Sequence, residues 1–298
     1  MKTLDKYIIA VDAGATGTEA MLYSATAGKI KEKIYPHVNY NLSGEKQTVK
    51  KLISVVKNLI SKKYPVAVLV AGISGARHEK DRAKIKSELK KKLNIKRIEI
   101  LPDTEIALAA SFGRDERNCG ILIAGTGSIL YYRDSVGKIK RAGGWGRHIG
   151  DEGSGYWIGR EALNKLGKYF DGTGKKTKLG VVLKKYFGIK NETMLNKVYH
   201  EKLEVSQIAE HVFRCAESGD AVSKKIIYEA AEHLAEHLRV LKNKNFKIAL
   251  CGSLFTKERL LERDLRKIVR ENYPTIKLIK SPNKPVWGAV RIGTESLF

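Results

Sequence analysis

The chain has 298 residues, of which 43% are apolar and 30% charged, and it carries a formal net charge of +24. This length is sufficient for two domains, and this apolar content is sufficient for buried cores. No run approaches the 18 or more uncharged apolar residues of a membrane span, and the start, MKTLDKYIIAVDAG, lacks the long apolar core of a signal peptide. We therefore expect a globular protein that has no membrane partner.

The excess of basic residues would suit a nucleic-acid partner, but its distribution does not favour one. The lysines are spread over predicted helix faces, such as 46–63, 79–93 and 174–202, with few aromatic residues among them. Faces of this kind are more often solvated surface or attract anionic metabolites.

The cysteines indicate the compartment. Cys119, Cys215 and Cys251 are widely spaced and form no CxxC pair. This spacing argues against a disulfide framework or a zinc site, so we expect a reducing cytoplasm.

The first half of the chain begins with strands and continues with alternating helices and strands. The apolar strand 7–12 ends on Asp12 and opens into the turn AGATGT. Apolar periodicity and turn residues predict the elements that follow. These are strands at 18–24 and 29–36, a helix at 46–63, a strand at 65–74, a helix at 78–93, a strand at 97–103 and a helix at 104–113.

The second half starts in the same order. From Cys119, the strand CGILIAG leads to the turn GTGS, a second strand, a glycine turn and the strand KIKRAGG. The first half has a strand, a Gly/Thr turn, a strand, a glycine turn and a Lys-Ile-Lys strand in that order. We interpret this as a duplication with a spacing of roughly 110 residues, too long for a solenoid repeat.

Helical sequence is then inserted before the strands return. Helices are predicted at 156–169, 178–187, 204–218 and 221–242, followed by a strand at 246–253, a helix at 256–272, a strand at 275–281 and a closing helix from near Pro285. Each half is thus predicted to be a mixed sheet covered by helices, with a cleft between the halves. We place the domains at 1–115 together with the helix 285–298, and at 116–284.

The two Gly/Thr turns are candidate phosphate-binding loops. Such a turn exposes backbone N–H groups to an anion, and Thr16 and Thr18 add hydroxyl donors. Asp12, at the end of its strand, can hold Mg²⁺ directly or through water. Gly/Thr turns also join ordinary hairpins, but the duplicated pair favours a triphosphate contacted by both loops. Neither loop matches a P-loop or a dinucleotide-binding fingerprint.

Asp103 is the candidate general base. It ends the strand RIEILPD and begins a helix, where an aspartate often serves only as an N-cap. A carboxylate at this place could instead accept the proton of a sugar hydroxyl that attacks a γ-phosphoryl group.

A glycine-dense loop, Gly143 to Gly155, is the candidate sugar-binding element. Its glycines permit positive φ and close approach to a ligand, and Asp151 and Glu152 can accept hydrogen bonds from vicinal hydroxyls. Trp145 could stack on a sugar ring. Asn39, Asn41 and Ser74 each follow a strand on the expected cleft side, although asparagine in a loop is often only a turn former.

At this point the chain resembles the actin, Hsp70 and hexokinase ATPase superfamily, and within it the BadF/BadG/BcrA/BcrD-type group that includes N-acetylglucosamine kinases. The resemblance covers nearly the whole chain, and the glycine-dense block is its most specific part. It rests on the motifs DAGATGTEA, AGISGA, LPDTEIALAA, LIAGTGSI, GGWGRHIGDEGSGYWIGREAL, LCGSLF and PVWGAV.

The resemblance implies two ribonuclease H-like (actin-like ATPase) domains and a role for each motif residue. Asp103 would be the catalytic base and Asp12 the residue near Mg²⁺. The phosphates of ATP would lie at Gly14, Thr16, Gly17, Thr18, Gly125, Thr126 and Gly127, and adenosine beside Gly252 and Ser253. The sugar would lie against Asn39, Ser74, Gly144, Trp145 and Asp151. The resemblance alone suggests a homodimer.

We therefore predict an ATP- and Mg²⁺-dependent kinase for the 6-hydroxyl of N-acetylglucosamine or a related amino sugar or hexose. The first loop departs from the family pattern, because Ala13 and Ala15 replace glycines and Gly17 replaces a basic residue. Two alternatives follow. One is an ATPase activator of a 2-hydroxyacyl-CoA dehydratase or benzoyl-CoA reductase, and the other is a catalytically silent sugar sensor.

Overall fold

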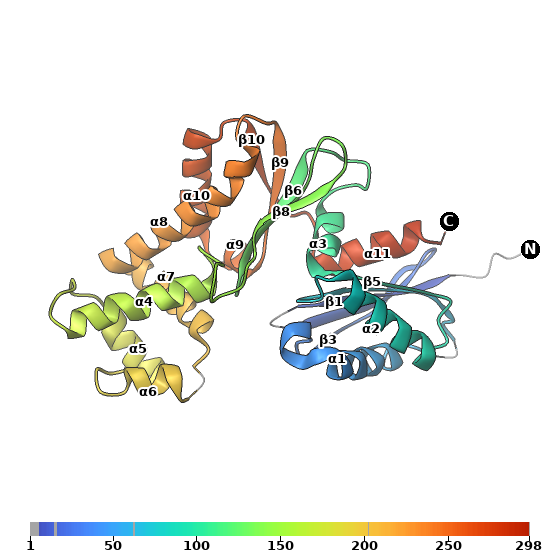
Figure 1. Ribbon diagram of the computed structural model, residues 1–298, viewed down its shortest axis with the longest axis horizontal. Helices are drawn as coiled ribbons and strands as arrows, with labels where there is room; N and C mark the ends of the chain where they lie inside the picture. Colours follow the sequence, from blue (N-terminus) through green and yellow to red (C-terminus); the bar gives the residue numbers. More distant parts are fainter. Residues whose placement is uncertain (1–5, 15–16, 62, 202, 298) are drawn as a thin grey trace, which may run out of the picture. The chain divides into compact units, whose positions relative to one another are not determined.

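The computed structural model describes residues 6–14, 17–61, 63–201 and 203–297. The chain divides into two compact units (Figure 1). The first comprises Met1–Glu116 with Ser281–Phe298, and the second Arg117–Lys280. The C-terminal segment thus returns to the unit in which the chain began.

The first unit is a five-stranded mixed sheet with helices on both faces. Its elements are β1 (Tyr7–Ala13), β2 (Thr18–Ser24), β3 (Gly28–Tyr35), α1 (Tyr40–Lys57), β4 (Val66–Ile73), α2 (Glu79–Lys92), β5 (Arg97–Pro102), α3 (Asp103–Ser111) and α11 (Pro285–Glu295). The strand order is β3-β2-β1-β4-β5. β1, β2 and β3 form an antiparallel meander, whereas β4 and β5 run parallel to β1.

Both faces of this sheet are buried, which explains the continuous apolar sequence of β1 and β4. α1 and α2 lie on one face, and α3 and α11 on the other (Figure 1). α11 approaches α3 closely, because a methyl group added at Gly288 would lie 1.8 Å from the carbonyl oxygen of Ile106. The glycine of PVWGAV is therefore a packing requirement of the sheet's second layer.

The second unit repeats the strand order. It comprises β6 (Cys119–Ala124), β7 (Ser128–Arg133), β8 (Ile139–Gly143), α4 (Gly155–Phe170), α5 (Leu179–Phe187), α6 (Met194–Tyr199), η1 (Val205–Gln207), α7 (Ile208–Glu217), α8 (Ala221–Glu236), η2 (His237–Leu241), β9 (Phe246–Cys251), α9 (Ser253–Lys257), α10 (Arg259–Asn272) and β10 (Ile276–Lys280). Its sheet has the order β10-β9-β6-β7-β8. The helices share one apolar core with this sheet. The predicted pair of duplicated actin-like domains, each a mixed sheet flanked by helices, is confirmed.

Some predicted helix bounds are wrong. Asn39, whose side chain accepts a hydrogen bond from the Asn41 N–H, caps a short segment before a kink at Gly44 (φ +68°, ψ 176°), which the expected helix 46–63 did not include. After the kink the start agrees with the expectation, and α1 ends at Lys57 rather than at 63. Ile60 falls beyond its end and is 39% exposed. The helix expected at 256–272 is split at Glu258, whose backbone is extended (φ −114°, ψ 93°).

Candidate active site

Two carboxylates of the first unit follow strands that run in the same direction. Asp12 lies near the end of β1, and Asp103 follows β5 as the first residue of α3. β4 lies between these parallel strands, so their carboxyl ends meet at one edge of the sheet. The charge of Asp103 acts on Asp12, so the topology brings together two residues that are far apart in the sequence.

Asp103 sits in a buried and hydrogen-bonded setting. Burial raises the pKa of its carboxyl, while hydrogen bonds from the Ser74 side chain and the Thr104 N–H, together with the charge of Arg77, act in the opposite direction. The Thr104 N–H lies 2.9 Å from Asp103 Oδ1. A carboxyl with a raised pKa and a fixed orientation is suited to accept a proton.

Asp12 has a second acidic neighbour that our sequence analysis missed. The hairpin register places Glu19 of β2 directly opposite Asp12. Burial, together with the charges of Asp103 and Glu19, raises the pKa of Asp12 to about 7. Lys284 Nζ lies 2.7 Å from Glu19 Oε1 and neutralises this neighbour. The antiparallel hairpin itself was the available signal, since it pairs these two positions.

Asn39 and Ser74 are adjacent. They form an isolated parallel bridge, in which the Tyr40 N–H donates to the Ser74 carbonyl at 2.9 Å. The Ser74 N–H in turn donates to the carbonyl of Ala13 at 2.9 Å. These bonds place both predicted sugar-binding residues beside the end of β1, where Asp12 lies. Asn39 also caps α1, so the turn-former role and a ligand role coexist in one residue.

The first Gly/Thr loop closes through its own backbone. The Gly14 N–H donates to the Gly17 carbonyl at 2.9 Å. Thr16 lies outside the described residues. Thr18 is fully buried, and its hydroxyl has no hydrogen-bond partner among the residues that the structure describes. A contact of Thr18 with phosphate stays a prediction.

The second loop closes in the same way and is also bonded to a helix. The Gly125 N–H donates to the Gly127 carbonyl at 2.9 Å. The Gly155 and Tyr156 N–H groups at the start of α4 donate to the carbonyls of Gly125 (2.8 Å) and Thr126 (3.3 Å). Two of the first N–H groups of α4 are thereby satisfied by the loop, which fixes its shape.

The glycine-dense segment is continuous with this loop. Asp151 adopts a left-handed conformation (φ +60°). Its carboxylate packs against the loop, because a methyl group at Gly127 would lie 2.8 Å from Asp151 Oδ2. The sequence predicted a phosphate loop at Gly125–Gly127 and a separate sugar-binding loop, and in the structure Asp151 of the second lies against Gly127 of the first.

The aromatic part of the segment lies at the surface. Trp145 is 61% exposed. The guanidinium of Arg141 lies over its ring, 4.2 Å from the centroid. Gly144, just before it, has φ +68°, and a methyl group there would lie 2.6 Å from Ile129. Arg141 therefore covers one face of an exposed ring through a cation–π contact, and stacking of Trp145 on a sugar stays a prediction.

The predicted adenosine residues reach the same loop. Gly252 has φ +99°, and a methyl group there would lie 2.3 Å from the carbonyl oxygen of Ala124. A methyl group at Gly125 would lie 3.7 Å from Ser253 Oγ. Thus, within the second unit, Gly125, Gly127, Asp151 and Ser253 form one cluster that is rich in backbone N–H groups.

These features match those of a known family. The model of the BadF/BadG/BcrA/BcrD ATPase family matches residues 9–293. The chain belongs to this family. Membership explains why both loops, both aspartates and the glycine-dense block occur in one chain.

Sequence relatives and a solved structure agree with this assignment. The N-acetylmuramic acid/N-acetylglucosamine kinase of Clostridium acetobutylicum is 31% identical over 96% of this chain and 98% of its own length. The N-acetyl-D-glucosamine kinase of Dictyostelium discoideum is 28% identical over 97% of this chain and 98% of its own. The crystal structure of a candidate N-acetylglucosamine kinase from Chromobacterium violaceum superposes with a TM-score of 0.78 at 22% identity, covering 96% of this chain and 98% of that one.

Among the described residues, no helix has both the length and the apolar content to cross a bilayer.

Proposed function

We propose that this protein is an ATP-dependent kinase that transfers the γ-phosphoryl group to the 6-hydroxyl of N-acetylglucosamine or a related amino sugar. The buried Asp103 carboxyl, hydrogen-bonded by Ser74 at the same sheet edge as Asp12, is the observation that supports it most. The activities of the relatives from Clostridium acetobutylicum and Dictyostelium discoideum point to the same class of acceptor.

Asp103 acts as general base in this proposal. Its ionised carboxylate accepts the proton of the sugar hydroxyl as that oxygen attacks phosphorus, and the Thr104 N–H and the Ser74 side chain keep the carboxylate oriented. A positioned base of this kind contributes about 10²- to 10⁴-fold to the rate. In the first unit, Asn39 beside Ser74 is the proposed sugar contact; for Asp151 and Trp145 of the second unit, a contact with the sugar stays a prediction.

The second loop and its neighbours receive the nucleotide. The Gly125 N–H is used by the Gly127 carbonyl, so in this proposal the N–H groups of Thr126 and Gly127 donate to phosphate oxygens. Gly252 has no side chain that could block adenosine beside Ser253. Thr16 and Thr18 of the first loop add hydroxyl donors to the phosphates.

Mg²⁺ fits the acidic edge of the first unit. The charges of Asp103 and Glu19 both act against ionisation of Asp12 there, and a divalent cation would relieve that repulsion. Mg²⁺ in nucleotide sites is usually held by about one or two carboxylates together with phosphates and water, so Asp12 is a sufficient protein ligand. The ion would supply charge neutralisation at the phosphates.

The activator alternative is not favoured by the cysteines. Cys119, Cys215 and Cys251 are all buried, whereas an iron–sulfur cluster between subunits needs thiolates at the surface. The free thiols also agree with the proposed cytoplasmic compartment, and a homodimer stays a prediction of the resemblance.

The test is ADP release over a panel of N-acetylglucosamine, glucosamine, N-acetylmuramic acid, N-acetylmannosamine and glucose. We expect stimulation by at least one amino sugar, with N-acetylglucosamine first. If no sugar stimulates release while the sugars still bind, the sensor replaces the kinase; iron–sulfur absorbance after anaerobic purification would restore the activator.

A further inference from the structure

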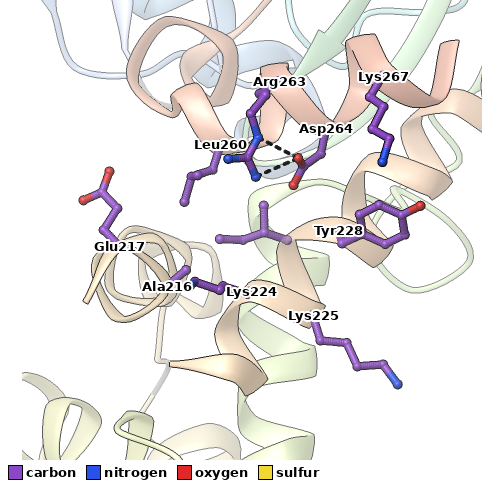
Figure 2. Close-up of a pocket in the computed structure, with 10 residues that line it drawn as sticks. Ala216, Glu217, Lys224, Lys225, Tyr228, Leu260, Arg263, Asp264 and Lys267 are labelled. Atoms are coloured by element: carbon purple, nitrogen blue, oxygen red, sulfur yellow. Dashed lines mark hydrogen bonds and ion pairs between the residues drawn. The ribbon is translucent and has the colours of Figure 1, made fainter. Parts of the chain in front are cut away.

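A groove on the helical side of the second unit has no role in the proposed kinase site. It has a volume of about 760 Å³ and is lined by the end of α7, the first half of α8 and the exposed side of α10 (Figure 2). Pockets of about 300–1,000 Å³ are typical of sites for small molecules.

The floor of the groove is apolar. Ala216 of α7 and Ile227 of α8 are buried beneath it, and the half-buried Leu260 continues it on α10. Tyr228, which is 41% exposed, adds an aromatic ring (Figure 2). A ligand with a ring or an apolar part would be partly desolvated here.

The rim is basic on both helices. α8 contributes Lys224 and Lys225, and α10 contributes Arg263 and Lys267. Glu217 and Asp264 are the acidic residues of the lining. Four cations against two carboxylates leave an excess of positive charge around the apolar floor.

Two of these cations already have partners. Arg263 Nη2 lies 2.8 Å from Asp264 Oδ1, as the dashed lines of Figure 2 mark. Lys225 Nζ lies 3.6 Å from Glu229 Oε1. Lys224 and Lys267 make no ion pair with any residue that the structure describes. Glu217 of the lining also makes no ion pair with a described residue, so these two lysines, one from each facing helix, leave a net excess of one positive charge.

We propose that this groove binds a small organic phosphate. Lys224 and Lys267 attract the phosphoryl group, and its apolar part lies on Leu260 and the ring of Tyr228. A phosphoryl group is the anion of choice because it carries about two charges and lysine binds it as a point charge. Part of the chain's excess of basic residues would thereby serve to bind a ligand. This binding does not depend on the kinase activity.

Phenyl phosphate is the probe, since it combines one ring with one phosphoryl group. We expect saturable binding in isothermal titration calorimetry, with inorganic phosphate weaker and phenol weaker still. Replacing both unpaired lysines (Lys224→Met with Lys267→Met) should weaken binding about tenfold, the sum of two partly exposed charge interactions.

The matched control removes the same charge elsewhere. Lys242→Met with Lys244→Met, beyond the other end of α8, should leave the affinity within about twofold. Lysine acetylation read by mass spectrometry gives a second measure. Phenyl phosphate should protect Lys224 and Lys267 but not Lys242.

Three results would overturn the proposal. One is an absence of saturable binding. Another is an equal loss of affinity in the two double variants, which would mean that only overall charge matters. The last is displacement of phenyl phosphate from Lys224 and Lys267 by a non-hydrolysable ATP analogue, which would make the groove part of the nucleotide site.

Discussion

The two Gly/Thr loops close with the same backbone hydrogen bond, but their surroundings differ. The loop at Gly14–Gly17 lies beside the carboxylates of Asp12 and Glu19, whose register joins them across β1 and β2. The loop at Gly125–Gly127 is bonded to the start of α4 and contacts Ser253. The same turn thus has carboxylates beside it in the first unit, and a helix start and Ser253 beside it in the second. From this difference we propose acid–base and metal chemistry for the first loop and anion binding for the second.

The largest loss of activity should follow a substitution in the first unit, at Asp103. Asp103→Asn keeps the shape of the side chain but removes the base, so kcat in the ADP-release assay should fall about 10²- to 10⁴-fold with little change in sugar affinity. Asp115→Asn, at an exposed position of the same unit, is the control. Full turnover in Asp103→Asn would remove Asp103 from this role.

A smaller effect, on the KM for ATP, is expected in the second unit, where we propose that the nucleotide binds. Gly252→Ala combines a positive φ with a contact of 2.3 Å to the Ala124 carbonyl oxygen, so the KM for ATP should rise about tenfold or more through displacement of the loop. Gly219→Ala has a similar φ of +93° and open space around it, and so reports the backbone strain alone. Equal effects of the two substitutions would show that the contact is unimportant.

The raised pKa of Asp12 predicts a pH-dependent stability. The folded state holds the proton up to about pH 7, whereas the ordinary pKa of an aspartate carboxyl is 3.8. This contribution to stability is complete below pH 3.8 and is lost as the pH rises through about 7. In EDTA, Asp12→Asn should therefore raise Tm more at pH 8 than at pH 4.5. A gain in Tm that does not change with pH would contradict the burial of this charge.

The smallest effects compare equivalent positions at the start of β2 and β7. Ser128 Oγ donates to the Glu152 carbonyl at 2.7 Å, so Ser128→Ala should cost about 1–3 kcal/mol of unfolding free energy. Thr18→Val, at a buried hydroxyl without a partner among the described residues, should be neutral or stabilising. Denaturant unfolding measures both. A rise in the KM for ATP in Thr18→Val would support its predicted phosphate contact, and an unchanged KM would oppose it.

Local patterns were enough for much of this protein. Apolar runs that end on Asp12 or in the GTGS turn predicted the strands and loops, because strand periodicity and turn chemistry are properties of neighbouring residues. The recurrence of that order in the second half predicted two mixed sheets of the same kind. The end of α1 was wrong, since Ile60 continues the apolar spacing although the helix ends at Lys57, and the short segment that Asn39 caps before the kink at Gly44 was missed.

By itself, the sequence determined which residue types were available and the order of the elements that present them. Only the tertiary structure decided which of them meet. The packing of Asp151 on Gly127, the pairing of Lys284 with Glu19, and the unpaired Lys224 and Lys267 on one groove all join positions that are distant in the chain. The physical reason is that burial and charge pairing depend on which elements pack together, and no local pattern records that.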